Sequence, residues 1–269
     1  MLNIIGKNIL KSLILPKPSS HKRENGRLLI IGGSYHYFGA LLYCLTTASR
    51  LVDLTYVLTT PENKKLLAKL KTQTAEFMPV DKYPHKQGFT DVDCILIGPG
   101  LGLSSRTKQL VRQALNSGKN LVLDADALNV LDGAMMKKLG PNCILTPHRR
   151  EFKRVFNQKP SDVIAGKMSK KYHCTILLKS PVDIIATPEG KIFYNKTGNA
   201  GMTKGGTGDV LAGLIAGLFC KNSALIAAAA GAYINGQAGD DLYKKQKTFY
   251  NAEDLSLQIP KTLAKYTSH

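Results

Sequence analysis

The chain has 269 residues, of which 43% are hydrophobic and 21% are charged, an ordinary composition for a globular protein with a sizeable core. No apolar run approaches the roughly 20 residues that a bilayer-spanning helix needs, so such a helix is excluded. The net charge of +18 is compatible with nucleic-acid binding, but the lysines are spread from Lys7 to Lys265, so nucleic acid is not expected as the main partner. The same positive field favours a nucleotide or dinucleotide substrate.

The first 20 residues mix short apolar groups with lysines and end in a Pro/Ser stretch. They lack the apolar core and the cleavage site of a signal peptide. We therefore expect an amphipathic lead-in helix and a linker over residues 1–20, followed by a single domain over residues 21–269.

The number and spacing of the cysteines indicate whether the protein is in a reducing or an oxidising compartment. There are five, an odd number, and none forms a CxxC pair. Each lies in an apolar run, which favours buried free thiols over disulfides or metal ligands. A reducing cytoplasm is the expected location.

Strands and helices alternate over the first part of the chain. Apolar runs such as Asp93–Ile97 predict strands that are covered on both faces. Strands are predicted at 27–33 (with its glycine turn), 54–58, 93–97, 120–124 and 142–146, and helices at about 41–49, 61–71 and 105–117. From Cys174 the pattern changes to short strands at 175–180, 182–187 and 191–194, with hairpin residues before the last, and then to three helices. This order predicts one α/β domain with three layers, α/β/α, around a mostly parallel central sheet.

Several predicted strands deliver glycine or polar residues at their carboxyl ends, where ligands bind in open parallel sheets. Three glycines within Gly98–Gly102 suggest that the backbone there approaches a ligand closely. Asp124 and Asp126 follow another strand, and they either face a ligand or cap a helix. His148 follows a third strand and is either structural or functional.

The stretch Gly198–Gly213 combines a glycine-rich loop, an acid and an apolar run with helical spacing, so a buried helix is expected to begin near Thr207 or Gly208. Gly205, Gly206 and Gly208 are expected to take positive φ and to turn several N–H groups toward one point, which the positive end of the helix also faces. That arrangement predicts an anion hole for phosphate. Asp209 beside it either takes a proton from a hydroxyl during phosphoryl transfer or merely caps the helix.

Taken in order, these motifs resemble the NAD(P)H-hydrate dehydratase family of the ribokinase-like superfamily. The resemblance runs from about His21 to Pro260. The motifs are GGSxxYxGA (32–40), GPGLG (98–102), DADAL (124–128), LTPHxxE (145–151), LLK (177–179) and GNxGMxxGGTGDVLAG (198–213).

The resemblance implies an enzyme that repairs hydrated NADH or NADPH (NADHX or NADPHX), a carbon–oxygen lyase that depends on ADP or ATP. Such enzymes phosphorylate the hydroxyl of the damaged nicotinamide ring and eliminate phosphate, releasing AMP from ADP or ADP from ATP. The resemblance also implies Mg²⁺ that bridges phosphate oxygens and a homo-oligomer, often a tetramer. For a stand-alone prokaryotic domain the family habit favours ADP, although the sequence itself does not decide between ADP and ATP.

The resemblance also assigns roles to individual residues. Asp209 is the implied catalytic base, and no direct metal ligand is expected, although Glu151 is a candidate for the water shell of Mg²⁺. The residues implied to line the hydrate site are Ala40, Gly102, His148 and Asp209. Those implied to bind nucleotide or phosphate are Lys179, Ser180, Pro181, Val182, Asp183, Gly205, Gly206, Thr207 and Gly208.

The sequence departs from the family pattern at a few positions. Arg149-Arg150 replaces the usual Pro-Gly after TPH, and Ser180 replaces the Gly after the LLK lysine. The arginines either add phosphate contacts or are merely exposed.

Two other functions stay open at this point. A small-molecule kinase of the same superfamily, of the thiazole or hydroxymethylpyrimidine type, would use the same base and anion hole. A basic nucleotide- or RNA-binding protein without catalytic activity would account for the charge.

Overall fold

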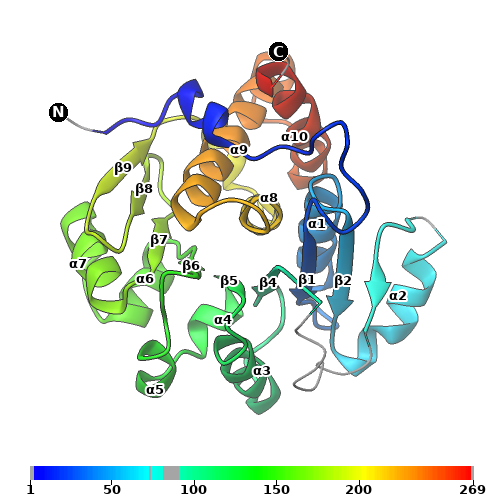
Figure 1. The fold of residues 1–269 in the computed structure, drawn as a ribbon, viewed down its shortest axis with the longest axis horizontal. Coiled ribbons are helices and arrows are strands. Elements are labelled where there is room, and N and C mark those ends of the chain that lie inside the picture. The colour runs from blue at the N-terminus through cyan, green and yellow to red at the C-terminus, as the bar shows by residue number, and fades with distance from the viewer. Residues whose placement is uncertain (1–2, 73, 81–90, 268–269) are drawn as a thin grey trace.

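In a computed structural model that describes residues 3–72, 74–80 and 91–267, a nine-stranded sheet forms the centre of the molecule (Figure 1). Its strand order is β3-β2-β1-β4-β5-β6-β7-β8-β9. Pairing is parallel from β3 across to β7, and β8 and β9 are antiparallel. The strands are β1 (Arg27–Ile31), β2 (Leu54–Leu58), β3 (Met78–Pro79), β4 (Cys94–Ile97), β5 (Asn120–Leu123), β6 (Cys143–Leu145), β7 (Thr175–Leu178), β8 (Asp183–Ala186) and β9 (Ile192–Asn195).

Helices cover both faces of this sheet, as the continuous apolar strands require. In β4, Cys94 and Leu96 belong to one apolar core, while Ile95 and Ile97 belong to the core on the opposite face. The first core lies under α1, α8, α9 and α10, and the second lies under α3–α7, as Figure 1 shows for α8–α10 and α3–α5. The helices are α1 (Phe38–Ala48), α2 (Lys64–Leu70), α3 (Ser105–Leu115), α4 (Asp126–Asn129), α5 (Gly133–Met136), α6 (Arg149–Phe156), α7 (Asp162–Tyr172), α8 (Thr207–Phe219), α9 (Ala224–Gln246) and α10 (Ala252–Thr267), with short 3-10 turns η1 (Lys7–Ser12), η2 (Pro61–Asn63) and η3 (Ala200–Thr203). The predicted three-layer α/β/α architecture with a mostly parallel sheet is confirmed.

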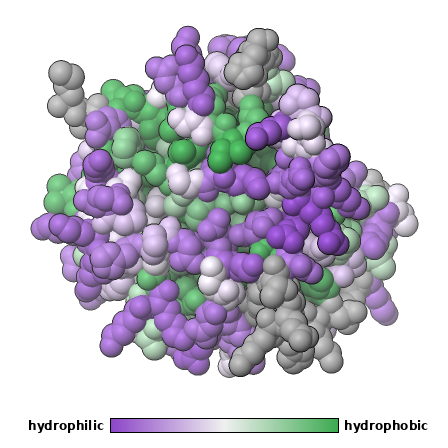
Figure 2. Space-filling view, in the orientation of Figure 1, coloured by the Kyte–Doolittle hydropathy of each residue, from purple (hydrophilic) through white to green (hydrophobic). Residues whose placement is uncertain are grey.

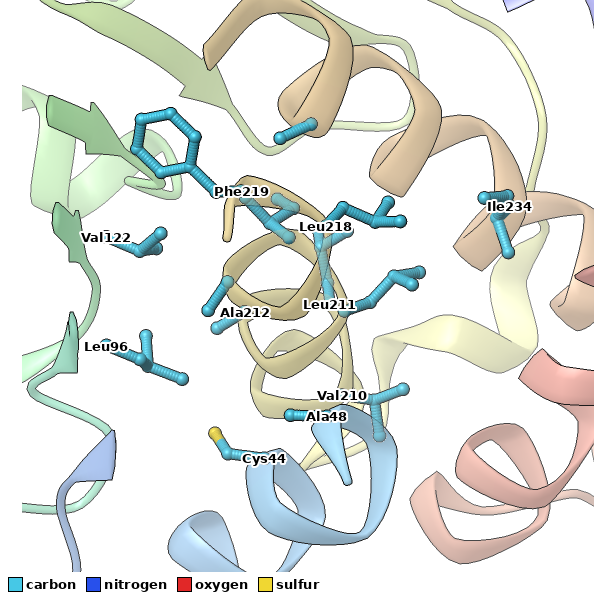
Figure 3. Close-up of a cluster of buried hydrophobic side chains, with 14 of the residues drawn as sticks. Cys44, Ala48, Leu96, Val122, Val210, Leu211, Ala212, Leu218, Phe219 and Ile234 are labelled. Carbon is cyan, nitrogen blue, oxygen red and sulfur yellow. The ribbon is translucent and has the colours of Figure 1, made fainter. Parts of the chain in front are cut away.

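Helix α8 lies inside the first core and contacts the sheet, α1 and α9 (Figure 3). Every residue from Val210 to Phe219 is buried. Gly213 allows the close approach to α1, because a Cβ there would lie 2.5 Å from the carbonyl oxygen of Cys44. The start of α8 at Thr207 confirms the predicted boundary.

The strand order reverses between β1 and β4, which makes their carboxyl ends a topological switch point. Gly33 N–H donates to the carbonyl oxygen of Pro99 at 2.8 Å, which joins the two glycine turns that follow these strands. A Cβ on Gly32 would lie 2.6 Å from the same oxygen. The glycines thus bring two backbone segments together at the edge where β5, β6 and β7 also end.

The N-terminal segment differs from the predicted amphipathic helix. It forms only the six-residue 3-10 turn η1, which contacts α9 and α10, and its Leu10 is buried. Before that turn, the Ile5 N–H donates to the carbonyl oxygen of Tyr194 at 2.9 Å, so the chain lies against β9. Residues 1–2 lie outside the described part, and the division into a 1–20 lead-in and a 21–269 domain stays a prediction.

The predicted free thiols are confirmed, since Cys44, Cys94, Cys143, Cys174 and Cys220 are all unpaired and buried. Among the described residues, no helix combines the length and the apolar character that crossing a membrane requires. On the face shown in Figure 2, hydrophilic side chains predominate and hydrophobic ones gather mainly near the top.

Candidate active site

The first turn of α8 presents several free N–H groups. Gly206, with φ 94°, is the N-cap, and its lack of a side chain is required because a Cβ would lie 2.5 Å from the ring of Tyr43. Within the described part of the chain, the N–H groups of Gly205, Gly206, Gly208 and Asp209 have no hydrogen-bond acceptor. Together with the helix dipole they form an anion-binding corner. The expectation that Gly205 and Gly208 take positive φ is wrong, because Gly208 is already helical and only Gly206 needs to turn.

Asp209 is the third residue of α8, and its side chain is half-buried. Burial raises its pKa to about 7, and the nearby Asp124 carboxylate adds to the rise, while the Lys179 ammonium opposes it. No donor from the described residues forms a hydrogen bond to this carboxylate, so it is not engaged in capping the helix. A carboxyl group with a pKa near neutrality is suited to accept a proton.

A buried ion pair lies beside Asp209. The Lys179 ammonium, just beyond β7, lies 2.8 Å from Oδ1 of Asp124, which follows β5 and is 2% exposed. The Thr146 hydroxyl, beyond β6, donates to the same oxygen at 2.8 Å. Asp124 therefore pairs with a cation and does not cap α4, whose N-cap is Ala125.

Lys179 also reaches the anion-binding corner. A Cβ built on Gly208 would lie 3.6 Å from Lys179 Nζ, which places the ammonium beside the first turn of α8. A cation at a helix N-terminus is unfavourable unless an anion accompanies it. The position suits an ammonium that will face a phosphate.

His148 is the N-cap of α6, so the structural interpretation of this residue holds. Its Nδ1 accepts from the N–H of Arg150 at 3.1 Å and of Glu151 at 3.2 Å, which leaves the proton of the neutral ring on Nε2. Glu151 completes a capping box by accepting from the His148 N–H at 2.8 Å. The His148 side chain is nonetheless 50% exposed beside the cluster, and its role in substrate binding stays a prediction.

Ala40 and Gly102 lie at the same edge, on the side of β1 and β4. Ala40 is in the first turn of α1, and a Cβ on Gly100 would lie 3.1 Å from the Ala40 Cβ. Gly102, at φ 81°, has open space where a Cβ would project, and its N–H donates to Asp126 Oδ2 at 2.7 Å. Asp126 is thus an anchor for this loop as well as a member of the first turn of α4.

The turn Ser180–Asp183 connects β7 to β8. Asp183 accepts from the Ser180 N–H at 3.0 Å and from Asn195 Nδ2 at 3.1 Å, while Pro181 and Val182 are exposed. Burial raises the pKa of Asp183. The turn follows Lys179 directly, and its role in nucleotide binding stays a prediction. Arg149 and Arg150, in the first turn of α6, are exposed.

Sequence reasoning missed the residues that hold the glycine loop. Asp240, in the C-terminal third of α9, accepts from Gly198 N–H and from Asn199 Nδ2, both at 3.0 Å. The fully buried Tyr250 donates its hydroxyl to Asn199 Oδ1 at 2.8 Å. The acids Asp240 and Asp241, which follow the largely apolar first two thirds of α9, were the one signal available, and nothing local marked Tyr250.

Removing the Tyr250 hydroxyl in Tyr250→Phe should lower the free energy of unfolding by about 1–2 kcal/mol, since a buried hydrogen bond is lost. Because the loop leads into the anion-binding corner, KM for the nucleotide should rise severalfold. Urea unfolding and steady-state kinetics measure the two effects. Tyr266→Phe, which removes the 2.7 Å bond between α10 and Gln237 and none to the glycine loop, should leave KM unchanged. Equal KM values in all three proteins would contradict the role of the loop.

The described residues contain no group of three or more His, Cys, Asp or Glu side chains that could hold a metal ion. Glu151, the candidate for a magnesium water shell, is 6% exposed, and both its oxygens face His148. The expected lack of direct metal ligands stays a prediction, and the present geometry ties Glu151 to its helix cap.

An anion-binding helix N-terminus beside a carboxylate without a hydrogen-bond donor, at the carboxyl edge of a parallel sheet, is typical of enzymes that transfer a phosphoryl group to an alcohol. The family model for NAD(P)H-hydrate dehydratase matches residues 28–261. The chain therefore belongs to the NAD(P)H-hydrate dehydratase family.

Relatives and solved structures agree with this assignment. The chain is 38% identical to the bifunctional NAD(P)H-hydrate repair enzyme Nnr of Methanocaldococcus jannaschii, over 97% of this chain and 52% of the relative. It is 34% identical to the ADP-dependent (S)-NAD(P)H-hydrate dehydratase of Cenarchaeum symbiosum, over 91% of this chain and 90% of that one. The structure of the ADP/ATP-dependent NAD(P)H-hydrate dehydratase of Bacillus subtilis, co-crystallised with ATP/Mg²⁺, has a TM-score of 0.83 at 24% identity, covering 98% of this chain and 99% of the other.

The structure of a ribokinase-like superfamily protein from Enterococcus faecalis has a TM-score of 0.86 at 29% identity, covering 100% of this chain and 97% of the other, which confirms the predicted ribokinase-like fold. The chain spans about half the length of the first three curated relatives it matches, each a bifunctional enzyme.

Proposed function

We propose that the protein is a nucleotide-dependent dehydratase that converts hydrated NADH or NADPH back to the normal cofactor. One observation carries the proposal: Asp209, with its pKa raised to about 7, has no hydrogen-bond donor among the described residues and adjoins the free N–H groups at the start of α8. Family membership supplies the substrate class. The ADP-dependent relative from Cenarchaeum symbiosum, which the chain matches over 90% of that protein's length, supports a nucleotide as phosphoryl donor.

In this proposal Asp209 takes the proton of the ring hydroxyl as the hydroxyl oxygen attacks the terminal phosphorus of ADP or ATP. The bond from that phosphorus to the bridging oxygen breaks, and AMP or ADP leaves. The N–H groups of Gly206 and Gly208 and the Lys179 ammonium face the phosphoryl oxygens as negative charge develops on them. Elimination then breaks the carbon–oxygen bond, phosphate leaves with the bonding electrons, and loss of a ring proton restores the double bond.

The scheme also assigns the residues around the two substrates and the place of Mg²⁺. Ala40, Gly102 and His148 would line the hydrate site, and Ser180–Asp183 would border the nucleotide. Mg²⁺ is proposed to arrive with the nucleotide, because this ion favours phosphate oxygens and water and the described residues offer no ligand cluster of their own. ADP or ATP, NADHX or NADPHX, a homotetramer and a cytoplasmic location are retained as predictions.

Incubating the protein with NADHX and ADP, and separately with ATP, should restore absorbance at the wavelength of the reduced nicotinamide. Phosphate should be released in equal amount. A stable phosphorylated product without phosphate release would instead identify a small-molecule kinase. No turnover with either nucleotide would refute the dehydratase.

The pH dependence offers a separate check on Asp209. Because only the ionised carboxylate accepts a proton, kcat/KM should fall about tenfold per pH unit below about pH 7, the pKa of Asp209, and level off above it. A pH–rate profile with an acid limb near pH 4 would show that the acting base is an ordinary carboxyl group.

A further inference from the structure

Asp124 is the least explained charged group at the site. It is 2% exposed, it follows β5, and within the described part of the chain its carboxylate forms hydrogen bonds to Thr146 and Lys179 and to none of the residues of the anion-binding corner. Its Oδ1 holds both the Lys179 ammonium and the Thr146 hydroxyl, each at 2.8 Å. A buried carboxylate held in this way is fixed in place by residues from the two strands that follow it in the sheet.

Three carboxylates lie near the Lys179 ammonium. Asp124, Glu151 and Asp209 all lie close enough to favour its charged form, yet of these three carboxylates it forms a hydrogen bond to Asp124. The same ammonium lies beside Gly208, one residue from Asp209. Without Asp124, the nearest way to keep a buried ammonium paired would be a direct bond to Asp209 or Glu151.

A direct bond between Lys179 and Asp209 would weaken the proposed base. An opposite charge within hydrogen-bond distance lowers a carboxyl pKa by about 1–3 units. The carboxylate would then hold a proton less strongly and would be a poorer acceptor for the substrate hydroxyl. The ammonium would also leave the place where phosphoryl oxygens are expected.

We propose that Asp124 is a positioning residue that holds the Lys179 ammonium beside Gly208 and off the Asp209 carboxylate, so that Asp209 stays an unpaired base. The inference rests on the proposed function for its kinetic consequence, but the charge arrangement can be tested without turnover. Among the described residues, the groups that interact electrostatically with Asp209 include Asp124 after β5, Asp126 on α4, Glu151 on α6, Lys179 after β7 and Cys44 on α1. Burial holds the pKa of the Cys44 thiol well above its usual range, so it contributes no charge.

The primary test is Asp124→Asn, which keeps the shape and removes the charge. The Asp209 carboxylate should lose the repulsion of the Asp124 charge and gain Lys179 as a direct partner, so the acid limb of the kcat/KM profile should move to lower pH by about one unit or more. The plateau should fall by about tenfold or more, because base strength and ammonium placement are both lost. An acid limb that stays at the wild-type pH would overturn the proposal.

Two further variants separate charge from packing. Lys179→Met should move the limb to higher pH, and the double variant Asp124→Asn with Lys179→Met should return it toward the wild-type value, although both turn over slowly. Thr146→Val removes a hydrogen bond to Asp124 without changing any charge, so it should lower stability and leave the limb in place. Equal displacement of the limb in Thr146→Val and Asp124→Asn would mean that Asp124 is merely structural.

A titration of the free protein keeps this proposal distinct from the function. In ¹³C-carboxyl spectra, the Asp209 resonance is identified by its loss in Asp209→Asn, and its midpoint should be lower in Asp124→Asn than in the wild type by about one unit or more. That shift in a protein without dehydratase activity would support the positioning role and refute the proposed function. If the midpoint of Asp209 were the same in both proteins and the wild type had dehydratase activity, the positioning role would be refuted and the proposed function supported.

Discussion

Replacing Asp209 with asparagine is expected to lower kcat by about two orders of magnitude or more, the usual loss when an acid–base group is removed. The amide has the same shape and cannot take up the hydroxyl proton. The N–H groups of the first α8 turn are unaffected, so the affinity for nucleotide should change little. Single-turnover kinetics and calorimetric titration with ADP measure the two quantities.

The same substitution should make the protein more stable. The pKa of Asp209 rises from 3.8 to about 7 on folding, so the unfolded chain releases this proton at lower pH than the folded protein does. This group therefore lowers the free energy of unfolding as pH rises from about 4 to 7, and the loss is complete above pH 7. At pH 8, Asp209→Asn should raise that free energy by about 1–2 kcal/mol, a figure reduced for the partial exposure of the side chain.

Asp162→Asn is the matched control, because Asp162 is also an acid in the first turn of a helix, α7. Its pKa is lowered, chiefly by the hydroxyl of Tyr194, so its neutralisation should reduce stability and leave kcat unchanged. If Asp209→Asn turned over at the wild-type rate, Asp209 would have no part in the mechanism.

Gly98→Ala should be the most damaging change to the fold. Gly98 has φ 122°, and a Cβ there would lie 1.9 Å from the carbonyl oxygen of Asp124 and 2.7 Å from the Cβ of Ala127. Backbone strain and overpacking add, so the free energy of unfolding should fall by about 3–5 kcal/mol. The melting temperature should drop by about 10 °C, and activity should fall as well because the displaced backbone carries Asp124.

Gly118→Ala separates the cost of backbone strain from the cost of a steric clash with the new Cβ. Gly118 also has a left-handed φ, of 69°, but a Cβ there would meet nothing within 4 Å. It should cost about 1 kcal/mol and leave activity intact. Thermal unfolding measures the loss of stability in both variants. Equal losses in Gly98→Ala and Gly118→Ala would contradict the assigned contact between residue 98 and Asp124.

Much of this architecture was predictable from the sequence because local patterns suffice for it. The run Cys94–Ile97 is apolar throughout, and only a strand covered on both faces buries all of it. The start of α8 followed from glycines before an apolar run with helical spacing. The roles of Ala40, Gly102 and Lys179 came from motif resemblance and are still to be tested by experiment.

The failures arose where a long-range partner decides the outcome. For Asp124 the sequence left contact with a ligand and helix capping both open, and it could not indicate the ion pair because Lys179 lies 55 residues away in the sequence. Asp240 and Tyr250 hold the glycine loop across 42 and 51 residues, distances at which no spacing rule applies. The N-terminal segment shows the same limit, because its pairing with Tyr194 and its contacts with α9 and α10, absent from any local pattern, replace the expected amphipathic helix.

The burial of all five cysteines gives the protein a built-in chemical reporter. A thiol-alkylating reagent added to the native protein meets no accessible cysteine, so it modifies only those molecules that have opened. Cys44 adds local information, because its Sγ donates to the carbonyl oxygen of Asp209 at 3.2 Å. The alkylation rate of Cys44 relative to the other four cysteines thus distinguishes local opening near Asp209 from unfolding of the whole molecule.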